Sequence, residues 1–204
     1  MSMDEQRAAL RQTLRSRRRA LSPEQQQHAS ARICQRLLEM PLLREVRHVA
    51  LYLPNDGEVD PTPLLEALWR REKYSYLPVL TPNRDLQFVR YTADTPMVTN
   101  RYGIDEPHPD YDQRIEPHKL QLVLLPLVGF DSRGGRLGMG GGFYDRTFAF
   151  KIADPCKGPA LVGLAHECQR VEQLALESWD VPLLAVVTDQ ELLANPALPA
   201  DGLY

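Results

Sequence analysis

Hydrophobic residues near the start of the chain recur at the spacing of an α-helix. Leu10 and Leu14 are four residues apart and are surrounded by six arginines between positions 7 and 19. Apolar positions on one side and charged positions on the others are typical of an amphipathic helix. The pattern therefore predicts a helix over residues 4–19.

A second helix start follows immediately. Ser22 precedes Pro23, and Gln25 lies three residues after the serine. This combination is typical of a capped helix whose first position is proline. The second helix is expected to end before Pro41, so that residues 1–41 form a helical pair packed on the main domain.

Beyond residue 47 the pattern changes to compact apolar runs separated by turn residues. We expect strands over residues 48–53, 74–80, 86–91, 120–128, 160–165 and 184–188, and helices over residues 61–71 and 144–151. Residues 92–118 are rich in proline, aspartate and asparagine and are expected to form a long functional loop with little regular structure. The alternation of strands and helices predicts an α/β fold with a single open, largely parallel sheet, flanked by helices on both faces.

Composition limits the classes of function. The chain has 204 residues, 43% of them hydrophobic, which suits one α/β domain spanning residues 1–204. The net charge of −3 and the pI of 6.0 argue against a general nucleic-acid binder. No apolar run approaches the roughly 20 residues of a membrane-spanning helix, and the N-terminus lacks the apolar core of a signal peptide. Three scattered cysteines favour reduced thiols, so we expect a cytoplasmic protein, and we expect it to be a monomer.

A glycine-rich segment follows the most apolar of the predicted strands. Five glycines occupy the eight positions from Gly135 to Gly142, next to Arg136. Successive glycines let backbone N–H groups converge on an anion, and an arginine adds a permanent positive charge. The segment is neither a P-loop nor a dinucleotide fingerprint, since position 143 is phenylalanine where the fingerprint needs glycine. A glycine-lined corner that serves only packing is the alternative, but the pattern favours a phosphate or nucleotide site.

Several segments resemble one enzyme family, in the family's order and approximate spacing. They are the arginine-rich first helix, the run 126–131 with the glycine-rich run 136–145, and the segments 52–59, 102–107, 163–170, 179–182 and 186–188. Together they resemble the 5-formyltetrahydrofolate cyclo-ligases, also called methenyltetrahydrofolate synthetases. The resemblance implies a ligase that forms a carbon–nitrogen bond. Such an enzyme uses Mg²⁺ and ATP to convert 5-formyltetrahydrofolate to 5,10-methenyltetrahydrofolate and releases ADP and phosphate.

The resemblance also implies which residues bind ATP. Two arginines of the first helix match the family's Lys-x-x-x-Arg pair, and the spacing of four places both on one helix face. The first of them is arginine where the family usually has lysine. Inside the glycine-rich segment, methionine stands where many relatives have arginine. The implied ATP-binding residues are Arg7, Arg11, Arg136, Leu137, Gly138, Met139, Gly140, Gly141, Gly142, Phe143 and Tyr144.

Metal and folate contacts follow from the same resemblance. Asp145 and Asp180 match the family's Mg²⁺-associated carboxylates, although a helix-start carboxylate and a turn residue are the plain alternatives. Leu53, Glu58 and Tyr102 match folate-contacting positions. A carboxylate suits the paired N–H donors of a pterin, and an aromatic ring can stack on it. The alternatives are an exposed turn residue for Glu58 and a loop anchor for Tyr102.

Three other functions remain open from sequence alone. One is a regulatory protein of the same fold that binds folate or nucleotide without catalysis. Another is a different α/β enzyme with a phosphate-bearing ligand, and the third is an RNA-associated protein that uses the arginine helix. His166 and Glu167 are adjacent, but no nucleophile, base and orienting group can be recognised together. No catalytic base is therefore assigned.

Overall fold

Both N-terminal helices begin with a capping box. The computed structural model describes residues 2–111, 113–200 and 202–203. Helix α1 (Met3–Arg19) is capped by Ser2 with Glu5, and helix α2 (Pro23–Glu39) by Ser22 with Gln25, as the sequence predicts for the second helix. A short helix, α3 (Pro41–Glu45), continues directly from α2.

Eight strands of the described chain form one mixed sheet. Its order is β12-β11-β10-β7-β1-β2-β3-β6. The five neighbours from β11 to β2 are parallel, whereas β12 pairs antiparallel with β11, β3 with β2, and β6 with β3. The strands are β1 (His48–Ala50), β2 (Tyr74–Leu80), β3 (Leu86–Tyr91), β6 (Arg114–Ile115), β7 (Leu122–Pro126), β10 (Ala160–Leu164), β11 (Ala185–Val187) and β12 (Leu192–Ala194). The predicted fold class, a largely parallel sheet with helices, is confirmed.

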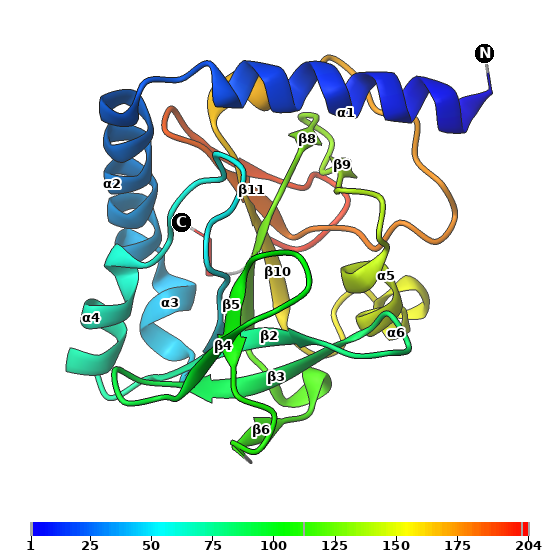
Figure 1. Ribbon diagram of the computed structural model, residues 1–204. Coiled ribbons are helices and arrows are strands. Elements are labelled where there is room, and N and C mark those ends of the chain that lie inside the picture. The colour runs from blue at the N-terminus through cyan, green and yellow to red at the C-terminus, as the bar shows by residue number, and fades with distance from the viewer. Residues whose placement is uncertain (1, 112, 201, 204) are drawn as a thin grey trace.

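Alternate residues of the central strand β7 serve two different cores. Leu122 and Leu124 pack in the cluster that includes residues of α2, α3 and α4 (Pro63–Arg70). Val123 and Leu125 pack in a second cluster with Phe148, which ends helix α5 (Phe143–Thr147). Because successive side chains of a strand point to opposite faces, the sheet is buried on both sides. Helix α1 lies across the top of the molecule, where the segments after β1 and β7 emerge (Figure 1).

Two predicted segments differ from the structure. The segment 92–118 is not devoid of regular structure: it carries the hairpin of β4 (Met97–Thr99) and β5 (Asp105–Pro107), then β6 and the 3₁₀ turn Pro117–Lys119. Residue 112 in that segment lies outside the described residues. The helix predicted over 144–151 is two short helices, α5 and α6 (Phe150–Ala153). The hairpin depends on pairing between its two short strands. Because neither strand has a hydrophobic period of its own, the sequence pattern does not indicate it.

Cys34, Cys156 and Cys168 are all free, as expected. Among the described residues, every helix is too short or too polar to span a membrane.

Candidate active site

The glycine-rich segment begins in a small hairpin outside the main sheet. Strands β8 (Gly129–Phe130) and β9 (Arg136–Leu137) pair antiparallel, and the buried carboxylate of Asp131 organises the turn between them. That carboxylate accepts hydrogen bonds from the N–H groups of Gly135 and Leu174, both at 2.9 Å. Burial opposes ionisation of Asp131, but these hydrogen bonds outweigh it and lower its pKa. Asp131 therefore shapes the entry to the segment.

The backbone from Gly138 to Gly142 is arranged as an open cradle. No hydrogen bond in the described part of the chain has one of these five N–H groups as its donor. Gly140 and Gly142 have φ values of +94° and +65°, which glycine adopts without the steric cost that a Cβ would add. Unpaired, successive N–H groups in such a segment suit an anion. The cradle has the donors that the sequence predicted for phosphate.

Helix α1 lies directly against the cradle through Arg11. Arg11 Nε donates to the carbonyl oxygen of Gly138 at 2.8 Å. A Cβ added to Gly140 would lie 3.4 Å from the guanidinium carbon of Arg11, so the loop passes close to that side chain. Burial lowers the pKa of Arg11 from its ordinary value, yet arginine stays charged at any physiological pH. Arg11 is thus a cation on the wall of the cradle.

Arg7, one turn earlier on α1, forms a two-pronged ion pair with Asp180. Its Nη1 and Nη2 donate to Asp180 Oδ2 and Oδ1 at 2.9 and 3.3 Å. Asp180 Oδ2 also accepts from the N–H of Glu177 at 2.9 Å. The hydrogen bond to Asp180 raises the pKa of Arg7. Both oxygens of Asp180 are therefore engaged in this structure.

A second arginine–carboxylate pair lies at the other end of the cradle. Arg136 Nη2 donates to Asp145 Oδ1, which also accepts from the N–H of Val181 at 3.1 Å. Val181 directly follows Asp180, so this hydrogen bond brings the segments of the two aspartates together. The other carboxylate oxygen of Asp145, Oδ2, takes part in no hydrogen bond among the described residues, and the side chain is 19% exposed.

The donor set suits a magnesium ion at Asp145 better than at Asp180. Mg²⁺ prefers one or two carboxylates together with waters and phosphate oxygens. Asp145 offers a free oxygen beside the cradle, whereas Asp180 would have to release Arg7 first. No group of three or more histidine, cysteine or acidic side chains in the described residues could hold a metal by itself. A metal here would depend on ligand oxygens as well as on the protein.

Glu58 lies in the turn that follows strand β1. Its side chain is 11% exposed, and its Oε2 accepts from the N–H of Asn55 at 3.1 Å. Burial raises the pKa of Glu58 to about 7, against the opposing charge of Arg18. The charge of Glu58 also contributes, after burial, to raising the pKa of Tyr144 in the glycine-rich run. Glu58, the predicted folate-contacting acid, therefore lies near Tyr144 at the end of the glycine-rich run.

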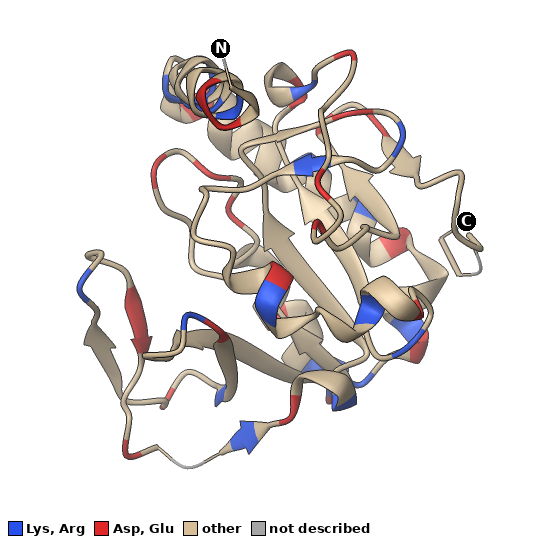
Figure 2. Cartoon of the chain, turned by 90° about the vertical axis from the view of Figure 1, so that its right-hand side faces the viewer, with Lys and Arg blue, Asp and Glu red and all other residues tan. Residues whose placement is uncertain are grey.

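The remaining predicted contact residues occupy different surroundings. Leu53 is partly buried and packs against the core. Leu137 is buried with Leu14 in a small cluster, so only its backbone could contact a ligand. Met139 is 53% exposed on the loop. Tyr102 is also 53% exposed, at the turn of the β4–β5 hairpin, which stands out from the body of the molecule in Figure 2.

The chain is similar over most of its length to one family of known proteins. The model of the 5-formyltetrahydrofolate cyclo-ligase family matches residues 3–189. The chain belongs to the 5-formyltetrahydrofolate cyclo-ligase family. It is 44% identical over 185 residues to the 5-formyltetrahydrofolate cyclo-ligase of Escherichia coli K12, covering 88% of this chain and 98% of that protein. With the cyclo-ligase of Haemophilus influenzae it shares 40% identity over 188 residues, which are 90% of this chain and 97% of the relative.

Solved structures of the cyclo-ligase family have the same fold. The NMR structure of Aquifex aeolicus 5,10-methenyltetrahydrofolate synthetase superimposes with a TM-score of 0.80 at 29% identity, covering 93% of each chain. The Mycoplasma pneumoniae 5,10-methenyltetrahydrofolate synthetase superimposes with a TM-score of 0.70 at 26% identity, covering 90% of this chain and 98% of the other. The predicted family and the predicted enzyme class, a ligase, are confirmed.

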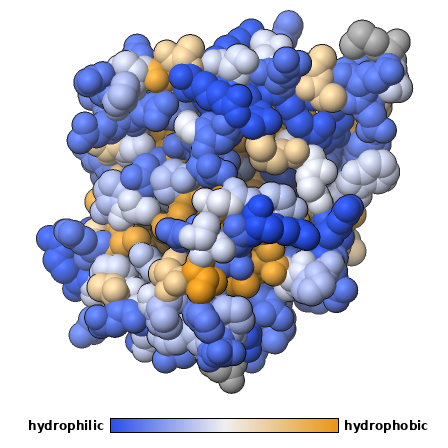
Figure 3. Space-filling model, in the orientation of Figure 1, coloured by the Kyte–Doolittle hydropathy of each residue, from blue (hydrophilic) through white to orange (hydrophobic). Residues whose placement is uncertain are grey.

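The sequence did not indicate one feature of α1, the engagement of three of its arginines by a single aspartate. Arg15, Arg18 and Arg19 all make ion pairs with Asp56 in the turn before Glu58. These ion pairs engage positive charges that a surface binding RNA would need. The top of the molecule, where α1 lies, is still mostly hydrophilic in Figure 3. The overlooked signal is spacing, since Arg18 continues the row of the partly buried Leu10 and the buried Leu14 at four-residue intervals.

Proposed function

We propose that this chain uses MgATP to cyclise 5-formyltetrahydrofolate to 5,10-methenyltetrahydrofolate, with release of ADP and phosphate. The observation that carries the proposal is a run of unpaired N–H groups, residues 138–142, followed closely by Tyr144, whose pKa the largely buried carboxylate of Glu58 helps to raise. The cradle suits a phosphate, and the carboxylate suits the paired N–H donors of a pterin. Membership of the cyclo-ligase family and the names of its relatives support the same reaction.

The proposed reaction has two steps. The formyl oxygen attacks the γ-phosphorus of ATP, the bond to the bridging oxygen breaks, and ADP leaves. N10 then attacks the activated formyl carbon, and the former formyl oxygen departs as part of inorganic phosphate while the ring closes and the N10 proton is lost to solvent. Phosphoryl transfer of this kind depends mainly on positioning and on stabilisation of charge. No side chain is assigned as a general base.

Each wall of the proposed site has a defined task. The N–H groups from Gly138 to Gly142 and the arginines Arg11 and Arg136 would hold phosphate oxygens. Arg7 would join them by exchanging Asp180 for a phosphate oxygen. Glu58 and Leu53 would orient the pterin, with Tyr102 reaching it from the hairpin as a stacking group. These assignments place both substrates between α1 and the carboxyl end of the sheet.

Asp145 would be the first carboxylate ligand of Mg²⁺, and Asp180 would be the second if Arg7 exchanged it for a phosphate oxygen. Mg²⁺ bound there would neutralise charge on the β- and γ-phosphate oxygens. Asp145 and Asp180 themselves keep Arg136 and Arg7 in position before substrates bind. The proposal includes a cytoplasmic location and a monomeric state, both of which stay predictions from the sequence.

A direct assay tests the proposed function. The purified protein is mixed with 5-formyltetrahydrofolate and MgATP, and the near-ultraviolet absorbance of the methenyl product is followed together with the release of ADP. We expect product and ADP in equal amounts, and neither without ATP. Binding of both substrates by a folded protein without any product would instead support the regulatory, non-catalytic alternative.

A further inference from the structure

The turn that carries Glu58 has a backbone conformation that needs external support. Asp56 and Gly57 have consecutive positive φ values of 55° and 75°, and the N–H of Glu58 donates to the carbonyl oxygen of Asn55 at 3.0 Å. For a residue other than glycine, the left-handed region is sterically unfavourable, although aspartate tolerates it better than most. Interactions outside the turn must therefore hold Asp56 in place.

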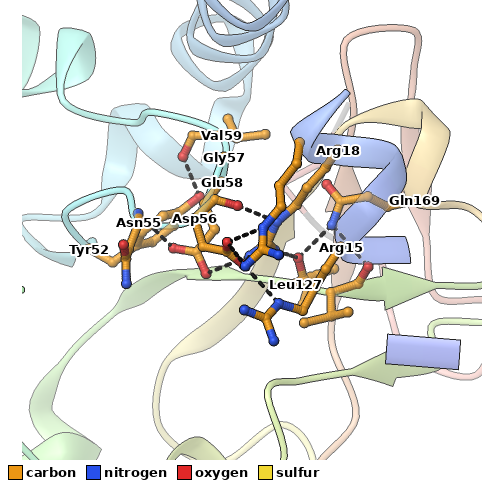
Figure 4. A network of polar contacts seen from close by, with 12 residues as sticks. Arg15, Arg18, Tyr52, Asn55, Asp56, Gly57, Glu58, Val59, Leu127 and Gln169 are labelled. Atoms are coloured by element: carbon orange, nitrogen blue, oxygen red, sulfur yellow. Dashed lines mark hydrogen bonds and ion pairs between the residues drawn. The ribbon is translucent and has the colours of Figure 1, made fainter. Parts of the chain in front are cut away.

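Arg18 supplies most of that support from α1. Its side chain is 0% exposed, and Figure 4 shows the guanidinium between the turn and the end of the sheet. Nε donates to the carbonyl oxygen of Asp56 and Nη2 to its carboxylate, both at 2.8 Å. Nη1 donates to the carbonyl oxygen of Leu127 at 3.1 Å. The buried side chain of Arg18 thus donates hydrogen bonds to both the backbone and the side chain of Asp56.

The contact with Leu127 connects the turn to the other wall of the site. Leu127 follows strand β7 directly and precedes the hairpin that leads to the cradle. Its carbonyl oxygen also accepts from Gln169 Nε2, and the neighbouring His166 contacts the carbonyl oxygen of Gly57 through Nε2 at 3.2 Å. Arg18 therefore lies where the segment of the predicted folate carboxylate meets the segment of the predicted phosphate cradle.

Arg18 also acts on the charge of Glu58. Its Nη2 lies 3.8 Å from Glu58 Oε1, too far for a hydrogen bond but close enough for a strong ionic interaction in a buried place. The other charged or titratable groups that face Glu58 are Arg15 on α1, Asp56 in its own turn, Tyr144 on α5 and Tyr52 after β1. Of the charged groups around Glu58, Arg18 lowers its pKa more than Arg15 does, and Asp56 raises it.

We propose that Arg18 is a positioning residue that holds Glu58 ionised and directed at the pterin, and that Asp56 sets the strength of this effect. The inference rests on the proposed folate-binding role of Glu58. Burial alone disfavours the ionised form of Glu58, and its pKa of about 7 already includes the opposing effect of Arg18. Asp56 competes for Arg18 and repels Glu58, and its own pKa is about 2 because hydrogen bonds from three arginines outweigh its burial.

Folate affinity measured against pH tests this proposal without any turnover. The dissociation constant for 5-formyltetrahydrofolate is measured by calorimetry in the absence of ATP, from about pH 6 to about pH 9. Because the ionised carboxylate accepts the pterin N–H groups, affinity of the unaltered protein should fall as the pH drops through about 7. Arg18→Gln should move the midpoint of this curve upward by roughly one pH unit.

Two further variants and one control test the direction in which the midpoint moves. Asp56→Asn keeps an amino acid that tolerates a positive φ but removes the competing charge, so it should move the midpoint downward. Arg18→Lys retains the charge without the planar fork, so it should leave the midpoint close to that of the unaltered protein. Arg17→Gln, which alters an exposed arginine on the same helix, is the matched control and should change nothing.

The outcomes separate this inference from the proposed function. If the unaltered protein binds no 5-formyltetrahydrofolate, the proposed function fails. If it binds with a midpoint near pH 7 and Arg18→Gln and Asp56→Asn both leave that midpoint unchanged, the role of Arg18 is refuted. A merely structural role would weaken affinity equally at every pH. If Arg18→Gln does not fold, Asp56→Asn alone is used: a downward shift of its midpoint supports the role of Arg18, and an unchanged or upward midpoint refutes it.

Discussion

Replacing Asp145 with asparagine is expected to lower kcat for cyclisation by roughly 100-fold or more. Asparagine has almost the same shape but removes the negative charge that pairs with Arg136 and that would bind Mg²⁺ through the free Oδ2. The Mg²⁺ concentration that gives half-maximal rate should also rise by roughly 10-fold. Steady-state rates measured over a Mg²⁺ titration at saturating ATP and folate report both quantities.

The matched control for this prediction is Asp94→Asn, which removes a charge from an exposed aspartate after β3. It should leave both the turnover and the Mg²⁺ dependence unchanged. If Asp145→Asn folds and behaves like this control, the metal assignment of Asp145 is wrong. A loss of turnover with an unaltered Mg²⁺ requirement would assign Asp145 to the orientation of Arg136 alone.

Replacing Glu58 with glutamine is the second large effect that we expect. An amide retains one acceptor oxygen but cannot accept two N–H groups with a full negative charge, and a hydrogen bond to a charged group contributes roughly 1.5–3 kcal/mol. At about pH 8, where Glu58 is mostly ionised, the KM for 5-formyltetrahydrofolate should therefore rise by roughly 10- to 100-fold. The KM for ATP should stay within about a factor of two, because the cradle is untouched.

The pH dependence gives this variant a second signature. In the unaltered protein, kcat/KM for folate should fall as the pH drops through about 7, because Glu58 then takes up a proton. Glu58→Gln removes the titrating group and should flatten that limb. Glu66→Gln, on the exposed side of α4, serves as the control. A normal KM and an unchanged pH profile in Glu58→Gln would show that this carboxylate does not contact the folate.

Local signals predicted most of the fold. Strands β2 and β3 have the predicted ends, and α2 begins at the predicted cap, because these elements have their own hydrophobic period or capping residues. The hairpin of β4 and β5 and the edge strand β12 have only three residues per strand. Such strands depend on pairing partners distant in sequence or across a turn, and so no local pattern indicates them.

The positions of candidate site residues could be predicted where they depend on spacing along one helix. The interval of four between Arg7 and Arg11 places both on the side of α1 that faces Asp180 and Gly138. The ion pair of Arg7 with Asp180 was not predicted, because it joins positions 173 residues apart. Arg18 was missed for a different reason. Consecutive arginines are usually a solvated face, and burial of one of them depends on acceptors in two separate loops.

The fate of the formyl oxygen shows whether this oxygen is phosphorylated during the reaction. 5-Formyltetrahydrofolate with ¹⁸O in the formyl group is converted with unlabelled ATP, and the inorganic phosphate is isolated and analysed by mass spectrometry. We expect one ¹⁸O atom in each phosphate released, because the formyl oxygen attacks the γ-phosphorus and leaves with it. Unlabelled phosphate with the label in water, or methenyl product formed without ATP hydrolysis, would contradict it.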